Sequence, residues 1–212
     1  MPPTFAPVTK KTNVMKKSVL IAVLAVFGLT STASAQEFVY FGVKGGVNFS
    51  NMTSDGFEEE NSRTGFHLGL LSEIPLGDRF SIQPEVLYST QGTEASHNSF
   101  GKVEYKLDYI HVPVLAKVYL IDGLSLEVGP SFNFLVEEEY ELTAGEGFAV
   151  IDTEMGSTFE FGGALGATYK FNNGFFTSAR YTRGFTDAFD SDNWDDDAVN
   201  NNGFQVGIGL MF

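Results

Sequence analysis

The sequence predicts an all-β fold: an eight-stranded antiparallel up-and-down transmembrane β-barrel with short periplasmic turns and long extracellular loops. Three observations predict it. Residues 204–212 alternate between large apolar side chains and glycine, glutamine or methionine, and successive side chains of a strand point to opposite faces. The same alternation recurs in segments along the chain. A secretory signal precedes these segments, which predicts that the folded part lies outside the cytoplasm.

The N-terminal region has the pattern of a secretory signal peptide. Lys16 and Lys17 precede an apolar run over residues 19–29, and residues 33–35 (Ala-Ser-Ala) provide a small-residue cleavage site. The apolar run is too short for a transmembrane helix, which needs about 20 residues. No later stretch of the sequence is long enough either. Any insertion into a membrane must therefore be through strands.

We expect residues 1–35 to comprise an upstream extension and a signal peptide (15–35) that is cleaved, and residues 36–212 to form one outer-membrane β-barrel domain. The second part carries 9 Lys and Arg against 27 Asp and Glu, a net charge of −18. This balance disfavours nucleic-acid binding, because phosphate contacts need a basic surface, and we expect no nucleic-acid partner. The chain has no cysteine, so it has no disulfide and no thiolate zinc site. We expect no cofactor.

Eight segments carry the alternation, and an even number of strands is expected for such barrels. Within the fourth, the alternation slips phase around residues 105–109, which predicts an irregular register there. Pro84, Pro113 and Pro130 lie inside segments. Proline has no N–H to donate, so we expect local bulges or kinks at these positions. In chain order the segments are residues 38–50, 64–75, 80–91, 103–120, 124–136, 157–171, 175–186 and 202–212.

The connections between these segments alternate strictly between tight and long. The tight ones span residues 77–79, 121–123 and 172–174, and two of them contain Asp-Gly or Asn-Gly, dipeptides that favour hairpin turns. In an up-and-down outer-membrane barrel the tight turns are periplasmic and the long loops extracellular. Both chain termini are therefore expected on the periplasmic side. The long loops are residues 51–63, 92–102, 137–156 and 187–201.

The two faces of the strands differ as expected for a membrane barrel. One face carries apolar residues such as Phe41, Leu68 and Val128, and the other carries charges. A soluble barrel of the lipocalin type would bury apolar side chains and expose charge. Eight strands enclose a space that side chains fill, so we expect a packed polar lumen without an open pore. The predicted lumen charge network sets Glu73, Glu85, Glu127 and Glu160 against Lys44, Lys117, Lys170 and Arg180.

The long loops hold 18 of the 27 acidic residues. Clustered carboxylates suit Ca²⁺ or Mg²⁺, and the densest candidate is Asp190, Asp192 and Asp195. This cluster lacks the glycine and the terminal glutamate of an EF-hand loop. A solvated acidic surface explains the loops better, so no metal site is assigned. Trp194, in the same loop, fits either a partner anchor or a membrane-interface aromatic residue.

Three histidines are the candidates for a base near neutral pH. His97, beside Ser96 and Ser99 in the second long loop, has the residue types of a lipid-modifying site. Nothing in the sequence brings these side chains together, and a Ser/His pair in a polar loop is common. We therefore expect no enzyme activity. His67 and His111 fall on the inward register, where a hydrogen-bonded role in the lumen is expected.

Several segments resemble the PorT-like outer-membrane β-barrels of Bacteroidetes-type bacteria. The resemblance covers the whole chain after the signal peptide. It implies an eight-stranded barrel similar in build to small OmpA-like and OmpX-like barrels, and it implies little about activity. The motifs that carry it are Gly-Val-Lys-Gly-Gly-Val-Asn-Phe-Ser at 42–50, Pro-Glu-Val-Leu-Tyr-Ser at 84–89, Leu-Asp-Tyr-Ile-His-Val-Pro-Val-Leu-Ala-Lys at 107–117, and Gly-Pro at 129–130.

Together these features predict a monomeric protein of the outer membrane with a structural or surface-interaction role, in envelope integrity or adhesion. The expected partners are outer-membrane lipid and lipopolysaccharide, with an extracellular ligand at the acidic loops. Two alternatives stay open. One is a lipid A-modifying enzyme, which would need a His, a Ser and a carboxylate within hydrogen-bond reach. The other is a narrow small-solute channel.

Overall fold

The computed structural model describes residues 39–53, 61–97, 101–144, 147–152, 158–186 and 200–212. Within these ranges the regular structure consists of nine strands in one antiparallel sheet. No helix in the described part of the chain has the length and apolarity needed to cross a membrane. The strands are β1 (Tyr40–Thr53), β2 (Asn61–Gly77), β3 (Phe80–His97), β4 (Gly101–Ile121), β5 (Leu124–Ala144), β6 (Gly147–Asp152), β7 (Phe159–Lys170), β8 (Phe175–Gly184) and β9 (Asn200–Met211).

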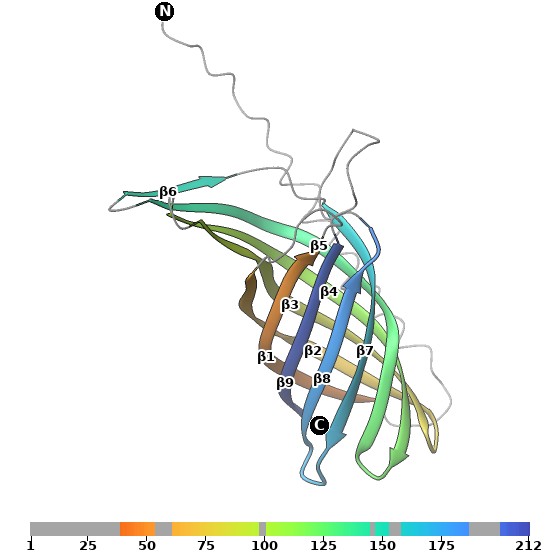
Figure 1. Cartoon of the computed structure of the whole chain (residues 1–212). Coiled ribbons are helices and arrows are strands. Elements are labelled where there is room, and N and C mark those ends of the chain that lie inside the picture. Colours follow the sequence, from red (N-terminus) through yellow and green to blue (C-terminus); the bar gives the residue numbers. More distant parts are fainter. Residues whose placement is uncertain (1–38, 54–60, 98–100, 145–146, 153–157, 187–199) are drawn as a thin grey trace, which may run out of the picture. The chain divides into compact units, whose positions relative to one another are not determined.

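Eight of these strands close into a barrel (Figure 1). They follow the order β4-β3-β2-β1-β9-β8-β7-β5, and pairing of β4 with β5 completes the ring. The first and last strands pair directly, and Phe41 and Phe212 exchange two backbone hydrogen bonds of 3.0 and 2.8 Å. The predicted eight-stranded antiparallel barrel is confirmed. Closure leaves no strand edge within the ring, as a lipid environment requires.

Tight turns join β2 to β3, β4 to β5 and β7 to β8, as predicted. Gly123 and Gly174 have positive φ values of 84° and 85°, a conformation that side chains other than glycine adopt at a cost. A Cβ atom at Gly174 would lie 2.6 Å from the carbonyl oxygen of Met211. Glycine is therefore needed in this turn both for its backbone conformation and for space.

All four predicted long loops are partly strand, and the second and third contain the longest strand extensions. β3 continues to His97, β4 begins at Gly101 and β5 continues to Ala144, followed by the added strand β6, which pairs with β5. The sequence pattern missed these extensions because apolar alternation marks only the part of a strand that contacts lipid. Beyond the membrane, backbone hydrogen bonds between strands can continue without that alternation. Figure 1 shows β3, β4, β5 and β6 reaching beyond the ring at the end opposite the tight turns.

The register is irregular where the alternation slips phase, with a shift between Asp108 and Tyr109 in the β4–β5 ladder. Of the bulges or kinks predicted at Pro84, Pro113 and Pro130, bulges are not found, because the register is the same on both sides of each proline. Pairs are missing from the ladder next to each proline, so the ladder is locally interrupted there. A missing N–H removes one ladder bond, and the neighbouring bonds of the closed ring hold the register.

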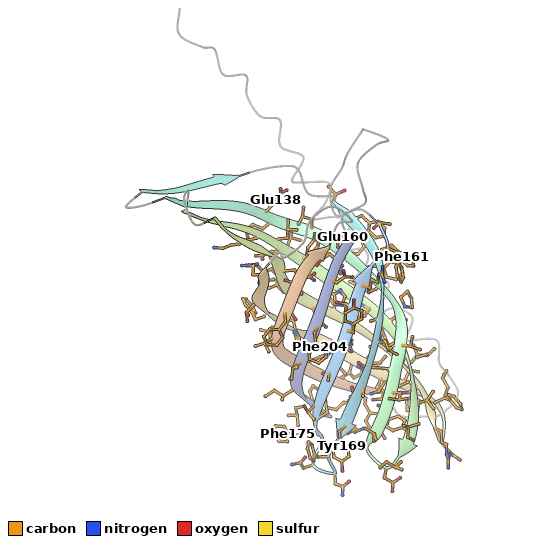
Figure 2. All side chains as sticks on the ribbon, in the orientation of Figure 1. Glu138, Glu160, Phe161, Tyr169, Phe175 and Phe204 are labelled. Atoms are coloured by element: carbon orange, nitrogen blue, oxygen red, sulfur yellow. The ribbon has the colours of Figure 1, made fainter. Side chains whose placement is uncertain are left out.

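Large apolar side chains cover the outside of the barrel. Aromatic residues gather toward both ends of the barrel wall: Figure 2 shows Phe161 toward the extracellular end and Tyr169 and Phe175 toward the tight turns. At the first end the rings of Phe161 and Phe132 have centroids 5.6 Å apart. At the second, the rings of Tyr169 and Phe171 meet edge to face at 4.9 Å. Such bands are typical of the two interfaces of a membrane barrel.

Candidate functional site: the polar lumen

The centre of the lumen is crossed by Arg180 on β8. Its guanidinium donates to both carboxylate oxygens of Glu85 on β3, at 2.9 and 2.8 Å, and to Glu127 on β5, at 2.9 Å. Each of these side chains is only 1% exposed. Lys44 on β1 lies 3.6 Å from the same Glu85 carboxylate. Two acids and two bases therefore neutralise one another in the middle of the barrel.

A second ion pair lies nearer the periplasmic end. The ammonium group of Lys117 on β4 is 3.2 Å from the carboxylate of Glu73 on β2. Glu73 also accepts hydrogen bonds from Ser81, at 2.8 Å, and from the hydroxyl of Tyr119. The Glu73 carboxylate thus accepts from three donors, and a buried charge is tolerated when it is paired and hydrogen-bonded in this way.

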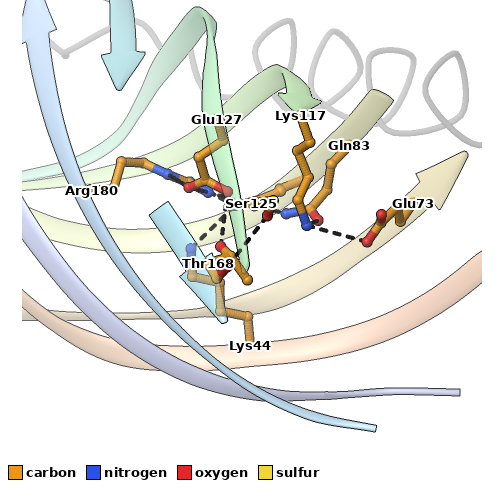
Figure 3. Close-up of polar contacts among 9 residues, drawn as sticks. Lys44, Glu73, Gln83, Lys117, Ser125, Glu127, Thr168 and Arg180 are labelled. Carbon is orange, nitrogen blue, oxygen red and sulfur yellow. Dashed lines mark hydrogen bonds and ion pairs between the residues drawn. The ribbon is translucent and has the colours of Figure 1, made fainter. Parts of the chain in front are cut away.

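Gln83 on β3 joins the two ion-pair groups. Its side-chain oxygen accepts from Lys117 at 2.8 Å, and its side-chain nitrogen donates to Glu85 at 2.7 Å. At the other end of the chain of contacts, Thr168 donates to Glu127 at 2.9 Å. Figure 3 shows these contacts as one connected set running across the barrel. We call these residues the lumen network: Lys44, Glu73, Gln83, Glu85, Lys117, Glu127, Thr168 and Arg180.

Glycines on the inward face make room for the long side chains of the network. A Cβ atom at Gly207 would lie 3.0 Å from both the Cε of Lys44 and the Nε2 of His67. The missing side chain at Gly207 thus leaves space for Lys44 and His67, whose side chains reach into the lumen from neighbouring strands. The consequence is a lumen filled by side chains at this level.

The structure brings together six of the eight predicted network residues: Lys44, Glu73, Glu85, Lys117, Glu127 and Arg180. Glu160 lies apart from them. It is also buried, but it accepts hydrogen bonds from Tyr109, at 2.8 Å, and from Asn133, at 3.2 Å. Among the described residues, no ion pair of Glu160 with a cation is seen.

Lys170 is not part of the buried network. It ends β7 at the periplasmic mouth of the barrel, where it is half-buried and its ammonium group lies 4.3 Å from the ring centroid of Tyr40. Its position in the alternation is inward, but the strand ends where water reaches the lumen. Without Glu160 and Lys170, the lumen network contains three acidic and three basic residues instead of the predicted four of each.

His67 and His111 are buried on the inward face, as their register indicated. The Nδ1 atom of His67 is 2.7 Å from the side-chain oxygen of Asn48, and His111 makes the same kind of contact with Asn133. An amide oxygen only accepts, so each Nδ1 carries the proton. The Nε2 atoms of both rings lack a hydrogen-bond partner within the described part of the chain.

Four further polar residues of the lumen support the charged and histidine side chains. Asn48, Gln83, Tyr109 and Asn133 are all buried hydrogen-bond partners of these groups. The alternation that places the charged residues inward also places Asn48, Gln83 and Asn133 on the inward face, whereas Tyr109 lies where the alternation slips phase. Their partners could not be read from the sequence, since contacts across a lumen depend on how the ring closes.

The other candidate residues carry no structural description. Asp190, Asp192, Asp195, Trp194 and Ser99 lie outside the described residues, as does the expected signal peptide. Ser96 and His97 lie on β3, but the placement of their side chains is likewise outside what the structure describes. Within the described residues, no group of three or more His, Asp or Glu side chains could hold a metal ion.

Comparison with known proteins agrees with this architecture. The family model described as "Outer membrane protein beta-barrel domain" matches residues 34–190. Among solved structures, the chain is similar to Neisserial surface protein A, with 14% sequence identity, a TM-score of 0.55, and coverage of 83% of this chain and 100% of that one. At this identity the similarity shows the fold alone. No curated protein sequence matches the chain.

Two further structures show a weaker similarity. The attachment invasion locus protein Ail of Yersinia pestis is 13% identical, with a TM-score of 0.48 and coverage of 83% of this chain and 100% of that one. The outer membrane protein OprG of Pseudomonas aeruginosa is 13% identical, with a TM-score of 0.43 and coverage of 84% and 98%.

Proposed function

Because the chain belongs to the outer membrane protein beta-barrel domain family, and so lies in the outer membrane, we propose that it is a surface-interaction protein acting in adhesion or envelope integrity. The observation that carries the proposal is the extracellular sheet formed by the ends of β3, β4 and β5 together with β6. This sheet presents a strand edge to the outside of the cell. The barrel is its anchor.

The filled lumen supports this role over transport. The side chains of Lys44, Glu85, Glu127 and Arg180 are each at most 2% exposed. Their charges neutralise one another across the full width of the ring. A solute passing through would have to separate buried ion pairs, which is strongly unfavourable. The proposal therefore includes a barrel without an open pore and without a catalytic step.

The strand β6 carries the exposed edge. It pairs with β5 through six residues, from Gly147 opposite Ala144 to Asp152 opposite Glu139. No other described strand pairs with it. Its sequence, Gly-Phe-Ala-Val-Ile-Asp, contains neither the lysine nor the proline that commonly protects a free edge. Such an edge binds extended polypeptide segments by adding a strand. The proposed partner at this edge is an extended segment of another protein.

Shortening the β5–β6 hairpin tests this role. In the test variant, an Asn-Gly turn replaces residues 141–150, joining Tyr140 to Ile151, which are paired in the ladder. Cells producing this variant are expected to attach to a protein-coated surface less than cells producing the wild type. Asp122→Asn in a periplasmic turn is the matched control. The proposal is wrong if cells with and without the protein attach equally and also show equal detergent sensitivity.

Proline substitutions test the edge itself. Alternate N–H groups of an edge strand point to the partner strand and to the free side. Of Ala149→Pro and Val150→Pro, one therefore removes a donor from the free edge and the other removes a donor from the β5 ladder. Loss of attachment with either variant supports strand addition when heat-dependent gel mobility shows a folded barrel. Full attachment by both folded variants rules it out.

Three further features belong to the proposal. The motifs at residues 42–50 and 107–117 support a PorT-like member of the family. The basic, apolar and small-residue regions before residue 36 support cleavage of a signal peptide. The closed ring supports a monomer, because it leaves no strand edge within the membrane for a second copy.

A further inference from the structure

An apolar groove of about 440 Å³ lies on the outer surface of the barrel, over β5, β7 and β8. Its exposed lining side chains face away from the lumen, so in the outer membrane the groove opens to lipid. It is separate from the lumen network and from the edge of β6. The outward side chains that form its walls are Val128, Pro130, Phe161, Leu165 and Phe185.

The groove exists because a side chain is missing at Gly163, whose position in the alternation is outward. A Cβ atom there would lie 3.1 Å from the ring of Phe185. Phe185 makes two contacts with Phe161. The Phe185 N–H donates to the carbonyl oxygen of Phe161 at 2.8 Å, and the two ring centroids are 6.0 Å apart. The groove is therefore formed by the residues of the barrel wall themselves.

The positively charged residue Arg183 lies at one end of the groove. Arg183 lines it and is exposed, and it is the penultimate residue of β8, at the end opposite the tight turn of residues 172–174. This is the extracellular end of the strand. The neighbouring outward residues on β8 and beyond it, Tyr181 and Phe185, are aromatic and exposed. Arg183 therefore lies in the aromatic band, at the level of lipid head groups.

We propose that this groove binds lipid A, with one acyl chain along the apolar wall and a phosphate group on Arg183. A planar guanidinium recognises phosphate through two parallel hydrogen bonds. The position of Arg183 along the barrel indicates which lipid binds. The extracellular half of the barrel wall lies in the outer leaflet of the outer membrane, which consists of lipopolysaccharide. The proposal depends on the location in the outer membrane and is independent of the proposed adhesion role.

Titration of lipid A into the folded residues 36–212 in neutral detergent, with bound lipid counted by native mass spectrometry, tests the site. Arg183→Gln is expected to weaken binding about fivefold, the contribution of one Lys or Arg at an anionic lipid surface. Gly163→Leu fills the groove and is expected to weaken binding more than about tenfold, since a chain loses contact over several methylene groups.

Matched controls are Arg79→Gln, in a periplasmic turn, and Gly45→Leu, at an outward position of β1. Both should bind lipid A as the wild type does. Heat-dependent gel mobility identifies folded variants. Arg183→Gln changes only an exposed side chain, so it decides the matter if Gly163→Leu does not fold.

Two other lipids separate the parts of the proposal. Dephosphorylated lipid A should bind the wild type as weakly as lipid A binds Arg183→Gln. Equal binding of the two forms of lipid A would overturn the phosphate contact. Binding of phosphatidylglycerol as tight as that of lipid A would overturn the choice of lipid. Equal binding by wild type and Arg183→Gln would overturn the site.

Discussion

Arg180 and Glu85 join opposite walls of the barrel. They lie on β8 and β3, which are four strands apart in either direction around the ring, and 95 residues apart in the sequence. Two hydrogen bonds of 2.9 and 2.8 Å connect the guanidinium to the carboxylate. The pair therefore fixes the width of the lumen as well as its charge.

Glu85→Gln removes one member of this buried pair. Arg180 would keep Glu127, but Lys44 would lose its only ion-pair partner among the described residues. Removing one partner of a buried pair typically lowers the free energy of unfolding by about 3–5 kcal/mol. Urea unfolding of the barrel in detergent measures the change. Glu137→Gln, at an exposed position on β5, is the control and should unfold as the wild type does. Equal stability of the two variants would contradict a structural role for the pair.

Gly174→Ala should destabilise the turn between β7 and β8. The φ of 85° is unfavourable for alanine, and the new Cβ would crowd the Met211 carbonyl oxygen. Strain of this kind costs about 1–3 kcal/mol. The urea midpoint should fall for this variant and stay unchanged for Asn172→Ala, which alters an exposed side chain of the same turn. A midpoint equal to that of the wild type would show that the turn can relax.

Val206→Arg tests which face of β9 meets lipid. Val206 is exposed on the outer surface near the middle of the strand, between Val47 on β1 and Ala179 on β8. An arginine at the bilayer midplane lowers the stability of a membrane barrel by about 2–4 kcal/mol. The measurement is unfolding in lipid vesicles, with Asn172→Arg in a periplasmic turn as the control. Equal stability of the two variants would place this face outside the membrane.

The sequence predicted the ring because its signal is local. The alternation around Val206 or Lys44 depends only on residues that are close in the sequence and point to the same face. The lengths of the connections then indicate which end of each hairpin is periplasmic. The partners of Glu85 could not be predicted in this way, because Arg180 comes close to Glu85 only when the eight strands have closed into a ring. β6 was missed for a different reason: its residues leave the membrane, and the lipid no longer imposes a period of two on them.

Lys170 shows the limit of the pattern within the barrel. Its alternation matches that of Lys44 and Lys117, but it lies at the last position of β7, beside Tyr40 at the mouth. Periodicity predicts whether a side chain points into the lumen or toward the lipid. It does not predict how far from the mouth of the barrel the residue lies. Glu160, at the other end of the lumen, lies on the same inward face as Glu127, but among the described residues it has hydrogen-bond partners and no cation partner.

The most direct test of the filled lumen is single-channel conductance of the folded residues 36–212 in a planar lipid bilayer. The structure predicts no steady open state above background, because Arg180, Lys44, Glu85 and Glu127 occupy the centre of the lumen. Replacing Arg180 and Glu85 together with alanine serves as the positive control, since it removes the pair that spans the ring. A steady conductance of the wild-type protein would contradict the account and favour a narrow channel.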